Sequence, residues 1–223
     1  MQRERKKREI RTPYDGLRIF SALTHGIGVW LFSVGVAVLI VIAAFMHSAL
    51  HVISYTVYGV TLIGLYTTST LYHCLKVRPS GRNTLRKLDH IMIYMLIAGT
   101  YTPICLLTLR GAWGWSIFGV IWGLAVVGSV VKLFWLKAPR WISAIAYIGM
   151  GWMALVAIVP LVQSMSVPAM ALLGGGGFFY TAGAILYALR WPGRERKYFG
   201  FHEVFHIFIL LGSICHFTMM LFL

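Results

Sequence analysis

Seven stretches of the chain are long and apolar enough to cross a lipid bilayer as helices. A transmembrane helix needs about 20 consecutive, mainly apolar residues to pass through the hydrocarbon layer. The candidate spans are residues 20–46, 51–75, 88–109, 114–136, 141–162, 169–189 and 203–223. The segments between them are too short to hold a separate soluble domain. The sequence therefore predicts an all-α bundle of seven transmembrane helices.

The composition agrees with a membrane location for most of the chain. Of the 223 residues, 59% are hydrophobic, and the mean hydropathy is +0.77. A soluble domain of this size cannot bury so much apolar surface, whereas lipid can cover it. The basic N-terminus is followed by an apolar stretch that is too long for the core of a signal peptide. We therefore expect a basic tail at 1–18 and a membrane domain at 19–223 that keeps its first span.

Lysine and arginine residues gather on one side of the predicted spans. Seven lie in the tail that ends at Arg18, five in the second loop, three in the fourth and four in the sixth, whereas the opposite side has only Arg110. Positive charge marks cytoplasmic loops, so the N-terminus is expected inside and the C-terminus outside. The formal net charge of +14 then reflects topology and contact with anionic lipid, and nucleic acid is not an expected partner.

Several polar residues of the predicted spans fall at one level of the membrane. Such residues are costly in a span and usually face the bundle interior or water. His73 ends the second span, with Ser69 one turn deeper on the same helix face, and Asp89 opens the third span. His202 and His206 open the seventh span and, four residues apart, point the same way. All five residues are expected in the cytoplasmic leaflet.

These residue types allow two interpretations. Three imidazoles, from His73, His202 and His206, make a typical open zinc site, and an aspartate such as Asp89 can bind the water there or orient a histidine. The plainer interpretation is three interfacial histidines, with Asp89 capping the third helix, where the positive end of the helix dipole stabilises it. Cys74 adjoins His73 but points about 100° away round the helix, so it is not an expected ligand.

Four segments carry polar motifs in a fixed order along the spans. They are Ser21–Gly28 (SALTHGIG), Ser69–His73 (STLYH), Leu88–Pro103 (LDHIMIYMLIAGTYTP) and His202–Phe217 (HEVFHIFILLGSICHF). This pattern resembles the hemolysin III family, the bacterial branch of the progestin and adipoQ receptor (PAQR) group, whose superfamily also holds alkaline ceramidases. The resemblance covers about residues 20–220.

The resemblance implies a seven-helix protein of the bacterial plasma (inner) membrane with its N-terminus inside. It also implies a zinc ion bound by His73, His202 and His206, with Ser69 and Asp89 beside the zinc and its water.

The remaining histidines of the motifs receive lesser roles. Family members usually carry an acidic residue and an asparagine before the Thr-His pair, and here Asp15 precedes His25 without an asparagine. His25 is expected to pack or to make an interfacial hydrogen bond. His90 is expected to turn away from the face of Asp89. His216 lies about 15 Å deeper than His206, too far to be a ligand, and is expected to be buried and hydrogen-bonded.

The functional prediction is a zinc-dependent hydrolase of a lipid amide or ester, similar to the ceramidases and acting in membrane lipid homeostasis. Asp89 would accept the proton of the attacking water, and Ser69 would help to position the reacting groups. One alternative is a non-enzymatic, lipid-sensing or regulatory protein whose zinc is structural. A second is a pore-forming cytolysin, which is disfavoured because pore formers usually convert from a soluble state. The sequence specifies neither a substrate nor an oligomeric state.

Overall fold

A computed structural model describes residues 17–46, 48–136, 138–193 and 200–223, and within these ranges the chain forms helices and no strands. The α-helices are α2 (Ile19–Met46), α3 (Ala49–Cys74), α4 (Pro79–Pro103), α5 (Gly111–Phe134), α6 (Arg140–Gly151), α7 (Ile158–Ser164), α8 (Val167–Leu189) and α9 (Phe201–Met220). A π-helical segment, Ile104–Leu109, continues α4, and a 3-10 segment, Trp152–Ala157, joins α6 to α7.

Seven helical segments of the described chain are long and apolar enough to cross a membrane, which confirms the predicted fold class. They are Ile19–Phe45, Ala49–Cys74, Pro79–Leu109, Gly111–Phe134, Trp141–Ser164, Val167–Leu189 and Phe201–Met220. The fifth span combines α6, the 3-10 segment and α7. Hydropathy located all seven because the spans differ from their connections in polarity.

The start of α4 differs from its predicted start. The third span was expected to begin at residue 88, but α4 begins at Pro79. A proline is tolerated in the first turn of a helix because the N–H group that it lacks has no partner there. The polar residues that follow Pro79 form helical turns ahead of the apolar stretch that hydropathy detects. Asp89 consequently lies well inside α4, and the interpretation that it caps a helix or meets a helix-dipole end is wrong.

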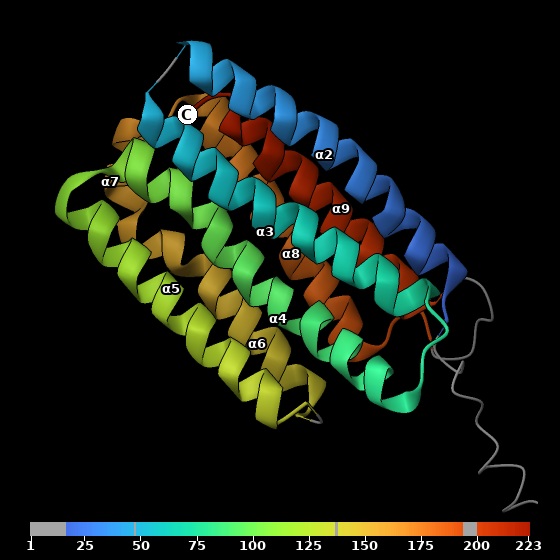
Figure 1. The fold of residues 1–223 in the computed structure, drawn as a ribbon. Helices are drawn as coiled ribbons and strands as arrows, with labels where there is room; N and C mark the ends of the chain where they lie inside the picture. The colour runs from blue at the N-terminus through green and yellow to red at the C-terminus, as the bar shows by residue number, and fades with distance from the viewer. Residues whose placement is uncertain (1–16, 47, 137, 194–199) are drawn as a thin grey trace, which may run out of the picture.

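The spans form a closed bundle in which sequence neighbours pack side by side (Figure 1). The chain packs α2 on α3, α3 on α4 and α4 on α5, and the last helix, α9, packs on both α8 and α2. One end of the bundle therefore collects the starts of α2, α4, α6 and α9 and the ends of α3, α5 and α8. We call it the basic end, because every described lysine and arginine except Arg110 belongs to its helix ends and connections.

Glycines allow very close approaches inside this bundle, and one of them lies between α8 and α9. A Cβ atom at Gly176 of α8 would overlap the imidazole ring of His216 on α9. Gly176, in the run Gly174–Gly177, thus allows α8 and α9 to pack closely. Gly174 meets nothing within 4 Å, so the run is not uniformly packed.

Candidate metal centre

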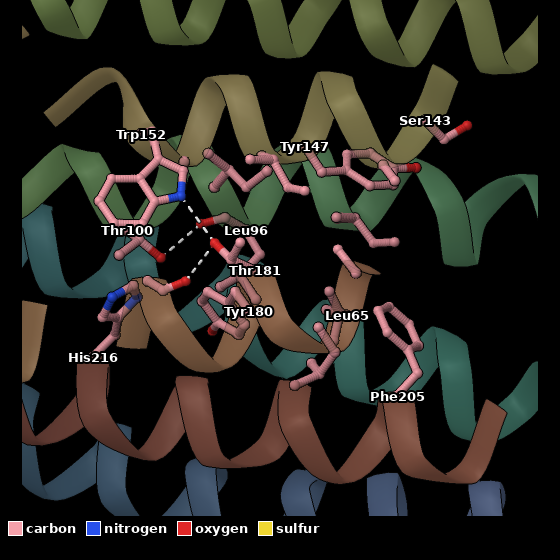
Figure 2. Close-up of a pocket in the computed structure, with 18 of the residues that line it drawn as sticks. Leu65, Leu96, Thr100, Ser143, Tyr147, Trp152, Tyr180, Thr181, Phe205 and His216 are labelled. Carbon is pink, nitrogen blue, oxygen red and sulfur yellow. Dashed lines mark hydrogen bonds between the residues drawn. The ribbon is translucent and has the colours of Figure 1, made fainter. Parts of the chain in front are cut away.

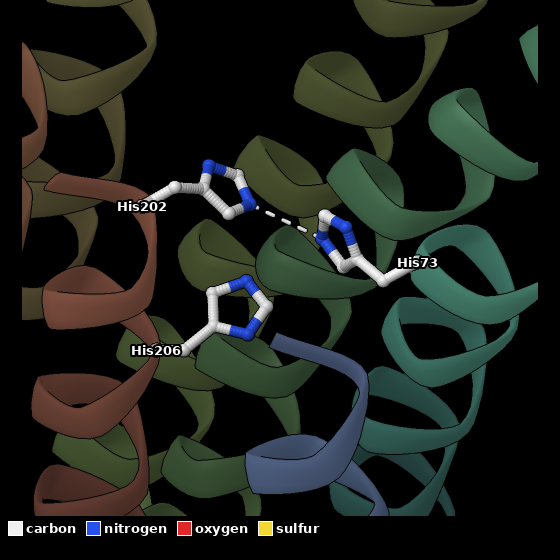
Figure 3. A group of neighbouring side chains, drawn as sticks. All are labelled: His73, His202 and His206. Atoms are coloured by element: carbon white, nitrogen blue, oxygen red, sulfur yellow. Dashed lines mark hydrogen bonds between the residues drawn. The ribbon is translucent and has the colours of Figure 1, made fainter. Parts of the chain in front are cut away.

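Three histidines from the two ends of the sequence converge at the basic end (Figure 3). His73 lies in the last turn of α3, and His202 and His206 lie in the first two turns of α9. One ring nitrogen from each residue lies within 4.8 Å of the others. The Nε2 atoms of His73 and His202 are 3.1 Å apart. The cluster could therefore bind a metal ion.

The donor set and its spacing suit a small divalent ion. Tetrahedral zinc bound at about 2.0–2.1 Å holds its ligand nitrogens about 3.3 Å apart. The 3.1 Å separation of His73 and His202 is close to that value, and all three ligand atoms lie within 4.8 Å of one another. His73 and His206 are both 2% exposed, whereas Cys74 is exposed and outside the cluster.

A backbone carbonyl group of α2 contacts the imidazole ring of His206. The Nδ1 atom of His206 lies 3.3 Å from the Ser21 carbonyl oxygen. A histidine that donates one ring N–H to a carbonyl presents its other nitrogen as a ligand in a fixed orientation. This contact thus directs the Nε2 atom of His206 toward the cluster.

His25 also packs directly on the cluster. Its ring stacks on that of His206, with centroids 3.7 Å apart and planes inclined by 18°. His25 is 3% exposed, and neither of its ring nitrogens has a hydrogen-bond partner among the described residues. Of the two roles predicted for His25, the structure therefore shows packing, and the surface that it packs on is a histidine of the cluster.

A polar clamp that the sequence analysis did not identify joins α2 to the start of α9. Arg18 Nη1 donates to both carboxylate oxygens of Glu203, at 2.8 and 3.0 Å. Ser21 Oγ donates to the same carboxylate at 3.2 Å, and the Gly200 N–H does so at 2.9 Å. Because Glu203 follows His202, this clamp sets the position of the first turn of α9. The sequence does show an acidic residue, Glu203, between the two histidines, but only the fold shows that Arg18 is its partner.

Ser69 and Asp89 face each other between α3 and α4. The Ser69 hydroxyl hydrogen-bonds the Asp89 carboxylate. The Asp89 side chain is 15% exposed, and the Nδ1 atom of His90 lies 3.6 Å from its Oδ2 atom. His90 was expected to turn away from Asp89, but its ring bends back to this carboxylate and to the Arg86 carbonyl oxygen at 2.9 Å.

A cavity of about 240 Å³ inside the bundle extends from these groups into an apolar interior. Figure 2 shows part of its lining. Its wall includes Ser69, Asp89, His202 and His206 and many aliphatic and aromatic side chains of α3, α4, α6, α8 and α9. His73 supplies its nitrogen to the cluster without lining the cavity. Two of the three clustered histidines, His202 and His206, therefore line the same cavity as the Ser69–Asp89 pair.

The other end of this cavity is polar as well. Trp152 Nε1 donates to Thr181 Oγ1 at 2.9 Å, and His216 Nε2 lies 3.3 Å from the Leu173 carbonyl oxygen. His216 is buried and hydrogen-bonded, as predicted, and it does not belong to the histidine cluster.

Comparison with known proteins gives one consistent result. The sequence matches the family described as "Haemolysin-III related" over residues 18–217. It is 41% identical over 204 residues to "Hemolysin-3" of Bacillus cereus, covering 92% of this chain and 90% of that protein. It is 39% identical over 204 residues to the "Hemolysin-3 homolog" of Bacillus subtilis, covering 92% of each.

A more distant similarity extends beyond bacteria. The human "Monocyte to macrophage differentiation factor" is 21% identical over 166 residues, which cover 72% of this chain and 66% of that protein.

Proposed function

The chain belongs to the hemolysin III family of multi-pass membrane proteins, and from that premise we propose that it is a zinc-dependent hydrolase of an ester or amide bond in a membrane lipid. One observation carries the proposal: two of the three clustered histidines and a hydrogen-bonded serine–aspartate pair lie on the wall of one largely apolar cavity. Concave apolar sites with a few converging polar groups are the usual form of small-molecule sites.

The proposed roles follow from the contacts of each residue. A zinc ion held by His73, His202 and His206 would polarise the acyl carbonyl and lower the pKa of a water molecule toward about 7. Asp89 would accept the proton of the attacking water as it adds to the acyl carbon. The C–O or C–N bond then breaks, and Asp89 returns the proton to the leaving oxygen or nitrogen. Ser69, by donating to Asp89, keeps the carboxylate oriented toward the cavity.

The proposed topology brings the substrate to this site. We place the basic end in the cytoplasm of a bacterial cell, with residues 1–18 as a cytoplasmic tail and 19–223 as the domain of the inner membrane, because lysine and arginine mark cytoplasmic loops. The site then lies near headgroup depth, where the ester or amide bond of a lipid is found. A cavity of about 240 Å³ is near the lower end of ligand sites, about 300–1,000 Å³, and suits one acyl chain better than two.

A structural metal site in a lipid-sensing protein is the competing proposal. The cluster joins the end of α3 to the start of α9, so an ion there would fasten two helices that are distant in sequence. The same ligands serve both proposals, and only the role of Asp89 separates them.

The test compares wild-type protein, Asp89→Asn and His206→Ala in detergent. Mass spectrometry measures the metal content, and turnover is followed on lipid amides and esters. We expect one zinc per chain and turnover in wild type, retained zinc without turnover in Asp89→Asn, and loss of both in His206→Ala. Zinc-loaded wild type that hydrolyses no lipid would favour the structural site. Full turnover by Asp89→Asn would contradict the role of the carboxylate.

A further inference from the structure

One lysine of the spans turns into the bundle instead of toward lipid headgroups. Lys132 lies in the last turn of α5 and is 3% exposed. Its Nζ atom donates to Ser143 Oγ on α6 at 2.6 Å. Lysines near the ends of membrane helices usually extend their charged group outward to the interface. The inward direction of Lys132 therefore needs a cause within the bundle.

No carboxylate in the described part of the chain forms an ion pair with this lysine. Its charged neighbour is a second cation, Arg86 of α4, whose like charge acts on Lys132. Arg86 likewise makes no ion pair there; it is attracted by Asp89 from one turn away. A buried charge is costly unless an opposite charge faces it. The buried Lys132 and the partly exposed Arg86 thus form a basic pair that an anion would complement.

The basic pair faces the cavity of the histidine site. Lys132, Arg86 and Ser143 line the same cavity as Asp89 and His206. In Figure 2, Ser143 lies at one end of the pocket and His216 at the other. An anion bound at this pair would therefore be the polar end of a molecule whose apolar part lies along the cavity wall.

Helix geometry relates the anion to the reacting bond. Arg86 precedes Asp89 by three residues, so it lies about 4.5 Å nearer the start of α4, and residues three apart are neighbours on a helix surface. A ligand that reaches both residues must carry its anionic group only a few atoms from its acyl bond. Single-chain lipids with a short polar linker have this arrangement.

We propose that the cavity binds a single-chain anionic lipid, with a phosphate or carboxylate held by Lys132 and Arg86 and its chain against the apolar wall. The inference rests on the proposed function in one respect: if the protein is a lipid hydrolase, anionic acyl lipids are its substrate class. Binding itself requires no turnover and can be measured separately.

The experiment uses full-length protein in a neutral detergent and ligands that cannot be hydrolysed. The probes are an oleyl ether of glycerol phosphate, oleate, and the neutral oleyl ether of glycerol. We expect at least one anionic probe to bind wild type about tenfold or more tightly than the neutral ether, since charge-assisted hydrogen bonds are stronger than neutral ones. The tighter anionic probe identifies phosphate or carboxylate as the preferred group.

Variants then assign the preference to the basic pair. Lys132→Met and Arg86→Met should each weaken binding of the anionic probe about tenfold and leave the neutral ether unchanged, which also shows that the cavity is intact. Lys132→Arg should retain most of the preference. Lys76→Met, at an exposed position outside the cavity, removes the same charge and should have no effect. Equal binding of anionic and neutral probes, or an unchanged preference in Lys132→Met, would overturn the proposal.

Discussion

His25 illustrates how a side chain without a hydrogen-bond partner among the described residues can pack on a candidate metal site. Its ring stacks on that of His206, with centroids 3.7 Å apart, and the Nδ1 atom of His206 lies 3.3 Å from the Ser21 carbonyl oxygen. The two contacts leave His206 little freedom to rotate. Hydrogen-bonding partners such as the Ser21 carbonyl oxygen orient a ligand histidine without binding the ion, and their loss typically lowers metal affinity 10–100-fold. We expect the stacked ring of His25 to act in the same way.

Replacing His25 should separate packing from hydrogen bonding. His25→Ala leaves a gap behind His206, and we expect zinc affinity to fall about tenfold or more. His25→Phe keeps a flat ring in the same place and should retain zinc within a few-fold of wild type. Competition with a chromogenic chelator measures both affinities. If the phenylalanine variant lost as much zinc as the alanine variant, the imidazole nitrogens rather than the stacking would be responsible.

At the scale of elements, close contact between α8 and α9 fixes the far end of the cavity. Gly176 has no room for a Cβ atom because the His216 ring occupies that space. Gly212 on α9 likewise faces the ring of Tyr180 on α8. Small residues let membrane helices approach closely where no hydrophobic effect drives them together. These two glycines therefore place α9, which also carries His202 and His206 at its other end.

Two glycines of the same run provide a matched pair for testing this packing. Gly176→Ala should lower stability by about 1–3 kcal/mol, the usual cost of overpacking. Gly174→Ala meets nothing within 4 Å and should be neutral or stabilising by up to about 1 kcal/mol, because alanine favours a helix over glycine. Thermal unfolding in detergent ranks wild type and the two variants by stability. A Gly176→Ala protein as stable as wild type would contradict the close approach.

For the whole molecule, the bundle separates two chemically different ends. The basic end holds the histidine cluster, the Arg18–Glu203 clamp and Lys132, whereas Arg110 is the described cation of the opposite end. If the bundle lies across a bilayer, its two ends face opposite sides of the membrane. The proposed orientation, with the basic end inside, places the reacting groups of the site in the cytoplasmic leaflet.

Cysteine labelling tests this orientation directly. In a Cys74→Ala background, Lys76→Cys lies at the basic end and Ala112→Cys at the opposite end, and both positions are exposed. A membrane-impermeant maleimide added to intact cells should label Ala112→Cys and spare Lys76→Cys, because positive loops stay inside. Inverted membrane vesicles should give the reverse pattern. Labelling of Lys76→Cys in intact cells would contradict the proposed topology.

Much of the fold and part of the candidate site could be predicted from the sequence. The number of spans follows from hydropathy, which is a property of each segment of about 20 residues taken alone. The histidine set followed from polar residues that share one level, and the structure brings these three together. Their metal, and the roles of Ser69 and Asp89, stay predictions. The polar start of α4 was missed because hydropathy does not register helical turns outside the apolar stretch.

Sequence alone thus determined which segments cross the membrane and which polar side chains lie at comparable depth, since both depend on position along one helix. The tertiary structure decided which of those side chains touch. The stacking of His25 on His206, the pairing of Arg18 with Glu203 and the inward turn of Lys132 each join helices that are separate in sequence. Such contacts depend on how each helix is rotated about its axis, and packing against its neighbours sets that rotation.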